Sequence, residues 1–90
     1  MTSQMPIEAD RDELLTLVRA AIERVAPEVD ATSIPTDVDY REEVELDSMD
    51  FLAVLTAIEE RTGISVPEVD YSEITTLDDL VSYLAAHVDR

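Results

Sequence analysis

Length and charge set the first limits on this chain. Its 90 residues suffice for one small domain, which we expect to span residues 1–90 with a flexible N-terminus over residues 1–6. With 22 acidic and 6 basic residues the net charge is −16, which excludes nucleic acids and anionic membrane surfaces as partners because both are negatively charged. Without cysteine there is no disulfide, zinc–thiolate site or thiol catalysis.

Nothing in the sequence predicts a membrane span or an export signal. No apolar run reaches the roughly 18 residues that a spanning helix needs. Residues 1–7 lack the basic start and the long apolar stretch of a signal peptide. We therefore expect a cytoplasmic monomer whose partners carry positive patches.

A first helix is predicted over residues 8–26, where apolar residues recur at steps of three and four. Pro27 ends it, because proline disfavours helical geometry at the residue before it. The apolar stripe consists of Leu14, Leu15, Val18, Ile22 and Val25.

Residues 27–46 show no sustained period and predict a long ordered loop, within which a short helical turn can form. Loops of this length in small domains are often functional. The apolar residues that would anchor it are Ile34, Val38, Tyr40, Val44 and Leu46.

A second helix is predicted from Ser48 to Thr62. Gly63 follows it, and glycine readily adopts the left-handed conformation needed just past a helix end. The inner face comprises Phe51, Val54, Leu55 and Ile58, which leaves Met49 and Leu52 at least partly exposed on another flank.

A short helical turn over residues 70–74 and a last helix over residues 77–88 complete the predicted elements. Thr76 and Asp79 form a capping pair before the last helix. The sequence therefore predicts an all-α fold, a small four-helix bundle of three main helices and one short helix with a long first loop. The last apolar stripe consists of Leu77, Leu80, Val81, Leu84 and Val88.

Half of the net charge surrounds the start of the second helix. Residues 37–60 hold nine acids and one base, Arg41. Ser48 opens the helix, where unpaired N–H groups and the helix dipole suit either a serine cap or a phosphate, so both interpretations stay open. Ser48 is not a catalytic nucleophile, because that role needs an adjacent base and the single histidine, His87, lies near the C-terminus.

The surface beside Ser48 has the pattern of a docking site. Met49 and Leu52 form an apolar spot with carboxylates around it, and such spots favour partner binding. Glu59 and Glu60 extend the acidic face along the helix.

An ordered set of motifs over residues 46–88 resembles the acyl carrier proteins, whereas the first helix and the long loop are similar to them in layout. The family pattern is an Asp-Ser-Leu core opening a helix, a pair of glutamates near its end, a hydrophobic-Pro step, and an Ile-Thr-Thr segment before the last helix. The matching residues are Asp47-Ser48-Met49, Glu59-Glu60, Val66-Pro67 and Ile74-Thr75-Thr76.

The resemblance implies an acyl-carrier-like bundle with a specific chemistry. Ser48 would carry a covalent 4′-phosphopantetheine arm, installed by a phosphopantetheinyl transferase. The thiol of the arm would hold an acyl group as a thioester and present it to acyl-loading and acyl-processing enzymes with basic patches. The resemblance thus implies a non-catalytic carrier with no metal site.

The resemblance also implies roles for residues around Ser48. Partners would contact the second helix, and acyl chains would lie between the helices. The residues implied for partner recognition are Asp47, Met49, Asp50, Leu52, Glu59 and Glu60. The residues implied for an acyl pocket are Val54, Leu55, Ile58 and Ile74.

Departures from the family pattern favour a specialised stand-alone carrier over housekeeping fatty-acid synthesis. Met49 replaces the usual leucine, and Glu45 and Leu46 occupy the region where a glycine is often found. Ala53 and Thr56 stand where fatty-acid carriers commonly have glutamate and methionine. The cargo would then belong to lipid, polyketide or related biosynthesis.

Three other functions compete with this interpretation. A peptidyl or aminoacyl carrier loaded by an adenylating enzyme shares the fold and chemistry, but such carriers are commonly less acidic. An acidic interaction module without a cofactor is the alternative of another class. A calcium loop starting at Asp37 is disfavoured, because Arg41 stands at its fifth position, its sixth residue is not glycine, and its twelfth residue is Ser48 instead of glutamate.

Overall fold

The computed structural model describes residues 10–87. The flexible N-terminus predicted over residues 1–6 and Val88 of the last stripe lie outside the described residues. Within them the chain forms three long helices, α1 (Asp10–Val25), α3 (Ser48–Thr62) and α4 (Leu77–His87). The shorter elements are the 3-10 helices η2 (Ala31–Ser33) and η3 (Glu68–Glu73) and the one-turn helix α2 (Tyr40–Glu43).

The predicted all-α bundle of three main helices is confirmed, with small shifts in the bounds. Helix α3 has the predicted bounds, and the predicted turn over residues 70–74 is η3, which begins two residues earlier. The long first loop contains two short helices, η2 and α2, where the sequence predicted one turn.

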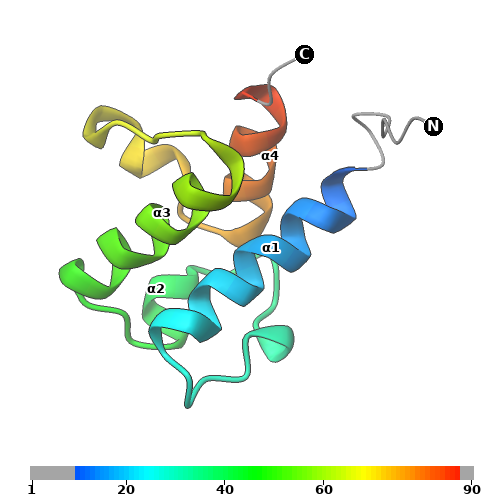
Figure 1. The fold of residues 1–90 in the computed structure, drawn as a ribbon. Helices are drawn as coiled ribbons and strands as arrows, with labels where there is room; N and C mark the ends of the chain where they lie inside the picture. The colour runs from blue at the N-terminus through cyan, green and yellow to red at the C-terminus, as the bar shows by residue number, and fades with distance from the viewer. Residues whose placement is uncertain (1–9, 88–90) are drawn as a thin grey trace.

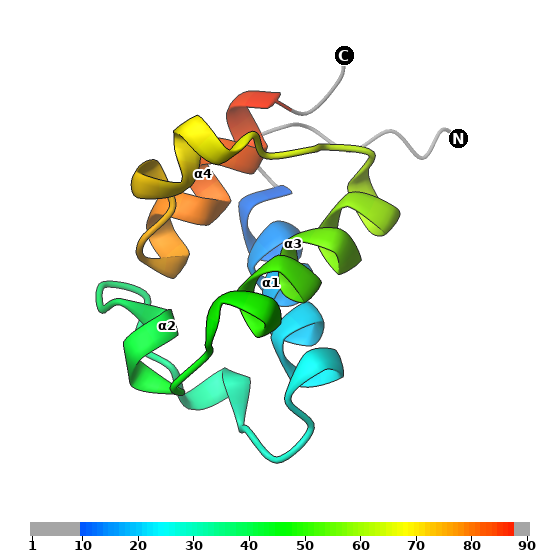
Figure 2. The same cartoon turned by 90° about the vertical axis from the view of Figure 1, so that its left-hand side faces the viewer.

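The long helices enclose a single apolar core. Helix α1 packs against both α3 and α4 and runs antiparallel to α3 (Figures 1 and 2). The inner face predicted for α3 is confirmed, because Phe51, Val54, Leu55 and Ile58 are all buried. The largest fully buried side chains are Tyr40, Ile22, Ile58, Ile74, Leu77, Leu80, Leu84, Val18 and Val54.

Polar side chains of α1 hold the first part of the long loop. The Arg19 guanidinium donates hydrogen bonds to the carbonyl oxygens of Ala31 and Ile34, the latter at 3.0 Å. One turn further along α1, Glu23 accepts a hydrogen bond of 2.9 Å from the backbone N–H of Ala31. Helix α1 therefore fixes η2 through charged groups in addition to apolar contacts.

The second part of the loop is joined to the start of α4. The Tyr40 hydroxyl donates a hydrogen bond of 2.6 Å to the carbonyl oxygen of buried Ile74. The backbone N–H of Asp78 donates to the carbonyl of Thr36 at 3.0 Å. These bonds give the loop a defined path across the bundle, as the sequence predicted for an ordered segment.

The predicted end of α3 and the predicted start of α4 are confirmed. Gly63 closes α3 in the left-handed conformation, with φ of 76°. At the start of α4, Asp79 accepts from the backbone N–H of Thr76 at 3.3 Å, and its own N–H donates to the Thr76 hydroxyl at 3.0 Å. This reciprocal pair satisfies two donors that the helix itself leaves without partners.

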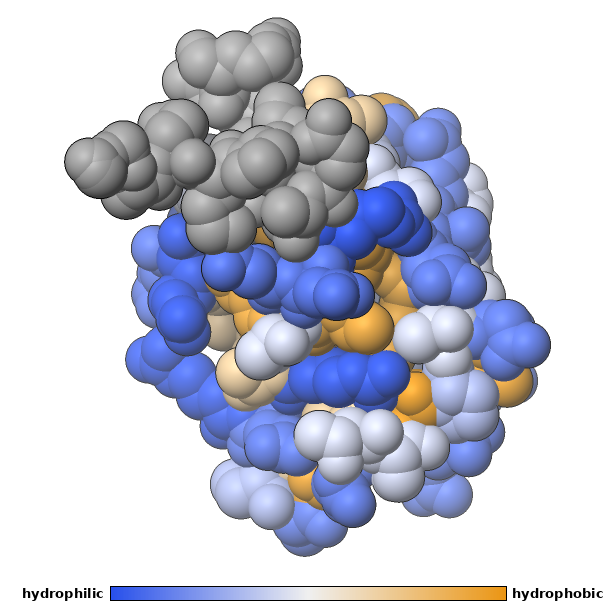
Figure 3. All heavy atoms as spheres, turned by 90° about the vertical axis from the view of Figure 1, so that its right-hand side faces the viewer, coloured by the Kyte–Doolittle hydropathy of each residue, from blue (hydrophilic) through white to orange (hydrophobic). Residues whose placement is uncertain are grey.

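Hydrophilic residues cover most of the face seen in Figure 3, with hydrophobic atoms visible in scattered areas between them. Among residues 10–87, no helix combines the length and the apolar character that crossing a bilayer requires.

Candidate functional site

The N-terminus of α3 is capped by Asp47 rather than by Ser48. The Asp47 carboxylate accepts a hydrogen bond of 2.8 Å from the backbone N–H of Asp50. Ser48 is the first residue of α3 and is exposed. The interpretation of Ser48 as a cap is therefore wrong, because its neighbour satisfies the N–H that the serine would have bound.

Two apolar side chains on the same helix are exposed to solvent. Met49 is 79% exposed and Leu52 is 47% exposed, although both side chains belong to an amphipathic helix with a well-packed inner face. They lie beside exposed Ser48 and follow the predicted flank. The predicted exposure of both residues is confirmed.

The carboxylates predicted for partner recognition all lie on α3 or at its cap. Asp47, Glu59 and Glu60 are exposed, and Asp50 is half-buried. Glu60 has a basic neighbour, since a guanidinium nitrogen of Arg24 in α1 lies 3.9 Å from a carboxylate oxygen of Glu60. Between side chains this exposed, such an ion pair contributes at most about 1 kcal/mol.

An aromatic cluster underlies the start of α3. The buried Phe51 ring meets the Tyr71 ring edge-on, with centroids 5.2 Å apart and an interplanar angle of 88°. The Tyr40 ring lies 6.5 Å from Phe51, and the Arg41 guanidinium lies over the Phe51 ring at 4.2 Å from its centroid. The sequence shows Arg41 as the one base among the acids of residues 37–60, but no pattern in it predicts this stacking.

The four residues implied for an acyl pocket share one core. Val54, Ile58 and Ile74 are fully buried, and Leu55 is 8% exposed. They come from α3 and from the residue that ends η3. An acyl chain could reach them only if these side chains moved apart.

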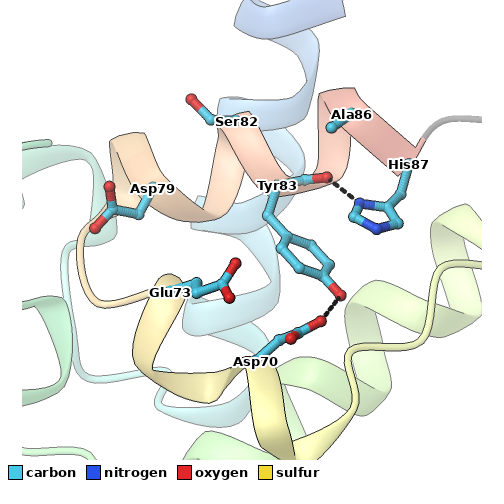
Figure 4. A pocket seen from close by; sticks show the side chains of 7 residues that line it. All are labelled: Asp70, Glu73, Asp79, Ser82, Tyr83, Ala86 and His87. Carbon is cyan, nitrogen blue, oxygen red and sulfur yellow. Dashed lines mark hydrogen bonds between the residues drawn. The ribbon is translucent and has the colours of Figure 1, made fainter.

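A groove of about 460 Å³ lies between η3 and α4 and does not include Ser48 in its lining. Figure 4 shows Tyr83 at its centre, donating a hydrogen bond of 2.7 Å to the Asp70 carboxylate. This hydrogen bond raises the pKa of Tyr83 to about 12. The His87 ring stacks on Tyr83 at 4.2 Å between centroids. The lining residues are Asp70, Glu73, Asp79, Ser82, Tyr83, Ala86 and His87.

Glu45, two residues before the Asp47 cap, adopts a left-handed backbone conformation with φ of 58°. A side chain with a Cβ is strained there by about 1–2 kcal/mol. This is the region where the sequence lacks the glycine of the family pattern.

Replacing Glu45 by glycine is expected to raise the free energy of unfolding by about 0.5–1 kcal/mol. Glycine removes the backbone strain, and the larger conformational entropy that it loses on folding offsets part of this gain. Urea unfolding followed by circular dichroism measures the change. Glu45→Ala removes the same carboxylate and keeps the Cβ, so it should give the smaller gain. Equal gains in the two variants would show that charge, and not backbone conformation, is responsible.

Comparisons with known proteins identify the family of this chain. The family model described as the phosphopantetheine attachment site matches residues 14–84. The acyl carrier protein of Rubrobacter xylanophilus is 29% identical over 79 residues, covering 87% of this chain and 95% of that protein. The acyl carrier protein of Treponema pallidum subsp. pallidum is 32% identical over 77 residues, covering 86% of this chain and 97% of that protein.

Members of this family act as carriers and not as enzymes, and they work with a phosphopantetheinyl transferase and with biosynthetic enzymes. The match covers all of α3, including its exposed start, and most of α1 and α4. The chain therefore belongs to the acyl carrier protein family and has a covalently attached 4′-phosphopantetheine group.

Proposed function

We propose that Ser48 is the attachment residue and that the chain is a stand-alone acyl carrier in lipid, polyketide or related biosynthesis. The observation that carries this proposal is the cap at α3. Asp47 makes the cap hydrogen bond at 2.8 Å, which leaves the exposed hydroxyl of Ser48 available to a modifying enzyme. A serine that served as the cap would hold its oxygen against the helix backbone instead.

The surroundings of Ser48 fit a phosphodiester. As the first residue of α3, Ser48 lies at the positive end of the helix dipole, where an anion is favoured. The arm itself supplies a thiol that forms the acyl thioester. The protein supplies the anchoring oxygen, a rigid helix and a recognition surface.

Partner enzymes would recognise the exposed side of α3. Met49 and Leu52 offer apolar contact next to the modified residue. Asp47, Asp50, Glu59 and Glu60 offer charge to basic patches, which speeds encounter and fixes orientation without high affinity. A carrier that visits several enzymes in turn needs this combination.

The side chains of Val54, Leu55, Ile58 and Ile74 are proposed to line the acyl site. Their shared burial supports this assignment, since all four belong to the one apolar core of the bundle. A bound chain would replace contacts among them with contacts to its own methylenes.

Charge supports an acyl cargo over an aminoacyl one, because the net charge of −16 is high for a peptidyl carrier. The family match argues against an acidic module without a cofactor. We also propose that the protein is a monomer, since self-repulsion at this net charge opposes self-association. We propose the cytoplasm as its location.

The attachment residue is tested by incubating the chain with coenzyme A and a broad-specificity phosphopantetheinyl transferase. The intact mass is expected to rise by one phosphopantetheine moiety, and Ser48→Ala is expected to abolish the gain. Ser65→Ala and Ser72→Ala are matched controls, because both serines are exposed and neither begins a long helix. A gain that persists in Ser48→Ala would assign the arm to another residue.

The cargo class is tested on the loaded protein. Acyl transferases are expected to convert its thiol to a thioester, whereas adenylating enzymes that supply amino acids are expected to leave it unchanged. Aminoacylation without acylation would reverse this assignment.

A further inference from the structure

We propose that Arg41 binds the phosphate of the prosthetic arm carried by Ser48, as a fixed cation beside the attachment site. This inference rests on the proposed function of Ser48. It assigns a role to a base that stands alone among nine acids in residues 37–60.

The backbone brings Arg41 close to the start of α3. The N–H of Leu46 donates a hydrogen bond of 2.8 Å to the carbonyl oxygen of Arg41. Leu46 stands two residues before Ser48, a span of at most about 7 Å along the chain. The main chain of Arg41 therefore lies within about 10 Å of the attachment residue, in reach of its own long side chain.

The side chain is fixed at the same end of the helix. Its guanidinium lies over the Phe51 ring, 4.2 Å from the centroid. Phe51 is three residues after Ser48, so the two are neighbours on the helix surface. Phe51 is itself buried and held edge-on by Tyr71, so the guanidinium is stacked on a platform that cannot turn freely.

The stacked guanidinium keeps its hydrogen-bond donors for an anion. Within residues 10–87, Arg41 forms no ion pair, although acidic residues surround it in sequence. A guanidinium presents paired N–H groups that match a phosphate, and stacking on a ring uses its face and not these edges.

A cation at this position would stabilise the attached arm. Its phosphodiester adds a negative charge next to Asp47 and Asp50, on a chain that already has a net charge of −16. Repulsion from these carboxylates would push the phosphate away from the helix. Arg41 offsets this repulsion and restricts the direction in which the arm leaves Ser48.

A thermodynamic cycle tests this inference. Urea unfolding is measured for the full-length protein with and without the arm, in the unchanged protein and in Arg41→Gln. Attachment of the arm is expected to raise the equilibrium constant for folding, and this increase should be about fivefold larger in the unchanged protein than in Arg41→Gln. A fivefold difference is the size expected for one partly exposed ion pair. This difference should shrink in 1 M salt, because salt screens exposed charges.

Arg61→Gln is the matched control. It removes the same charge from the last turn of α3, about 20 Å along the helix from Ser48. The effect of the arm in Arg61→Gln should equal that in the unchanged protein. In NMR spectra, the Arg41 side-chain Nε–H signal should move on attachment of the arm and the Arg61 signal should not.

The intact mass distinguishes a failure of the proposed function from a failure of this inference alone. An arm absent from Ser48 would overturn the proposed function and this inference together. An arm present on Ser48, with equal stability effects in Arg41→Gln and Arg61→Gln and an unmoved Arg41 signal, would overturn this inference alone.

Discussion

Attachment of the arm is expected to slow about 100-fold, measured as kcat/KM of the transferase, when Met49 and Leu52 are both replaced by alanine. The two side chains are 79% and 47% exposed beside Ser48, so a partner enzyme can bury them. Truncating a buried anchor of an interface costs about 1–2 kcal/mol, and two such losses give the expected factor. The rate is followed by intact mass against time.

Val69→Ala is the control for exposed apolar surface in general. Val69 is 84% exposed on η3, so its truncation removes a similar contact from another element. Its effect should stay below threefold, and all variants should keep the unfolding free energy within about 0.5 kcal/mol of the unchanged protein. An unchanged rate in the double variant would show that Met49 and Leu52 take no part in recognition by the transferase.

Replacing Tyr40 by phenylalanine is expected to lower the free energy of unfolding by about 2 kcal/mol. The variant keeps the buried ring and loses the hydroxyl that donates to the Ile74 carbonyl at 2.6 Å. A buried acceptor deprived of its donor costs about 1–3 kcal/mol. Such a loss is a large fraction of the stability of a 90-residue domain.

Tyr71→Phe is the matched control for this loss. Tyr71 packs against the same Phe51 ring but is half-buried, so its hydroxyl can exchange partners with water. Urea unfolding should show a loss below about 0.5 kcal/mol for this variant. Equal losses at Tyr40 and Tyr71 would contradict a special role for the Tyr40 hydroxyl.

Alkaline pH should weaken the fold through the hydroxyls of Tyr40 and Tyr83. Burial raises the pKa of Tyr40 above its ordinary value of 10.0, and the Asp70 hydrogen bond raises that of Tyr83 to about 12. Above pH 10 the unfolded chain loses these protons while the folded chain keeps them. Stability is thus complete below pH 10 and falls as the pH rises toward 12. The fall should be shallower in Tyr40→Phe, and an unchanged slope would contradict this assignment.

The long helices could be predicted because their signals are local. Three- and four-residue spacing of apolar side chains placed α1 and α4, and Gly63 closed α3 where the pattern of Phe51 and Ile58 ended. The exposure of Met49 and Leu52 followed from the same pattern, since residues off the inner face point to solvent.

The remaining features depend on contacts between distant residues. Arg19 lies within the helical pattern of α1, and no spacing rule shows that its guanidinium reaches the carbonyl of Ile34. Tyr40 was predicted to anchor the loop, but its partner Ile74 is 34 residues away along the chain. At the site itself, Asp47 and Ser48 are both good caps, so only the backbone geometry could decide between them.

The path of the first loop determines how this protein responds to proteolysis. On one side of Pro35, the carbonyls of Ala31 and Ile34 are bound by Arg19 of α1. On the other side, the Thr36 carbonyl is bound by the N–H of Asp78 in α4. A protease that cuts the exposed peptide here leaves two fragments, each with its new end still attached to a long helix. We therefore expect the nicked carrier to retain its shape and its two fragments to separate only in denaturant.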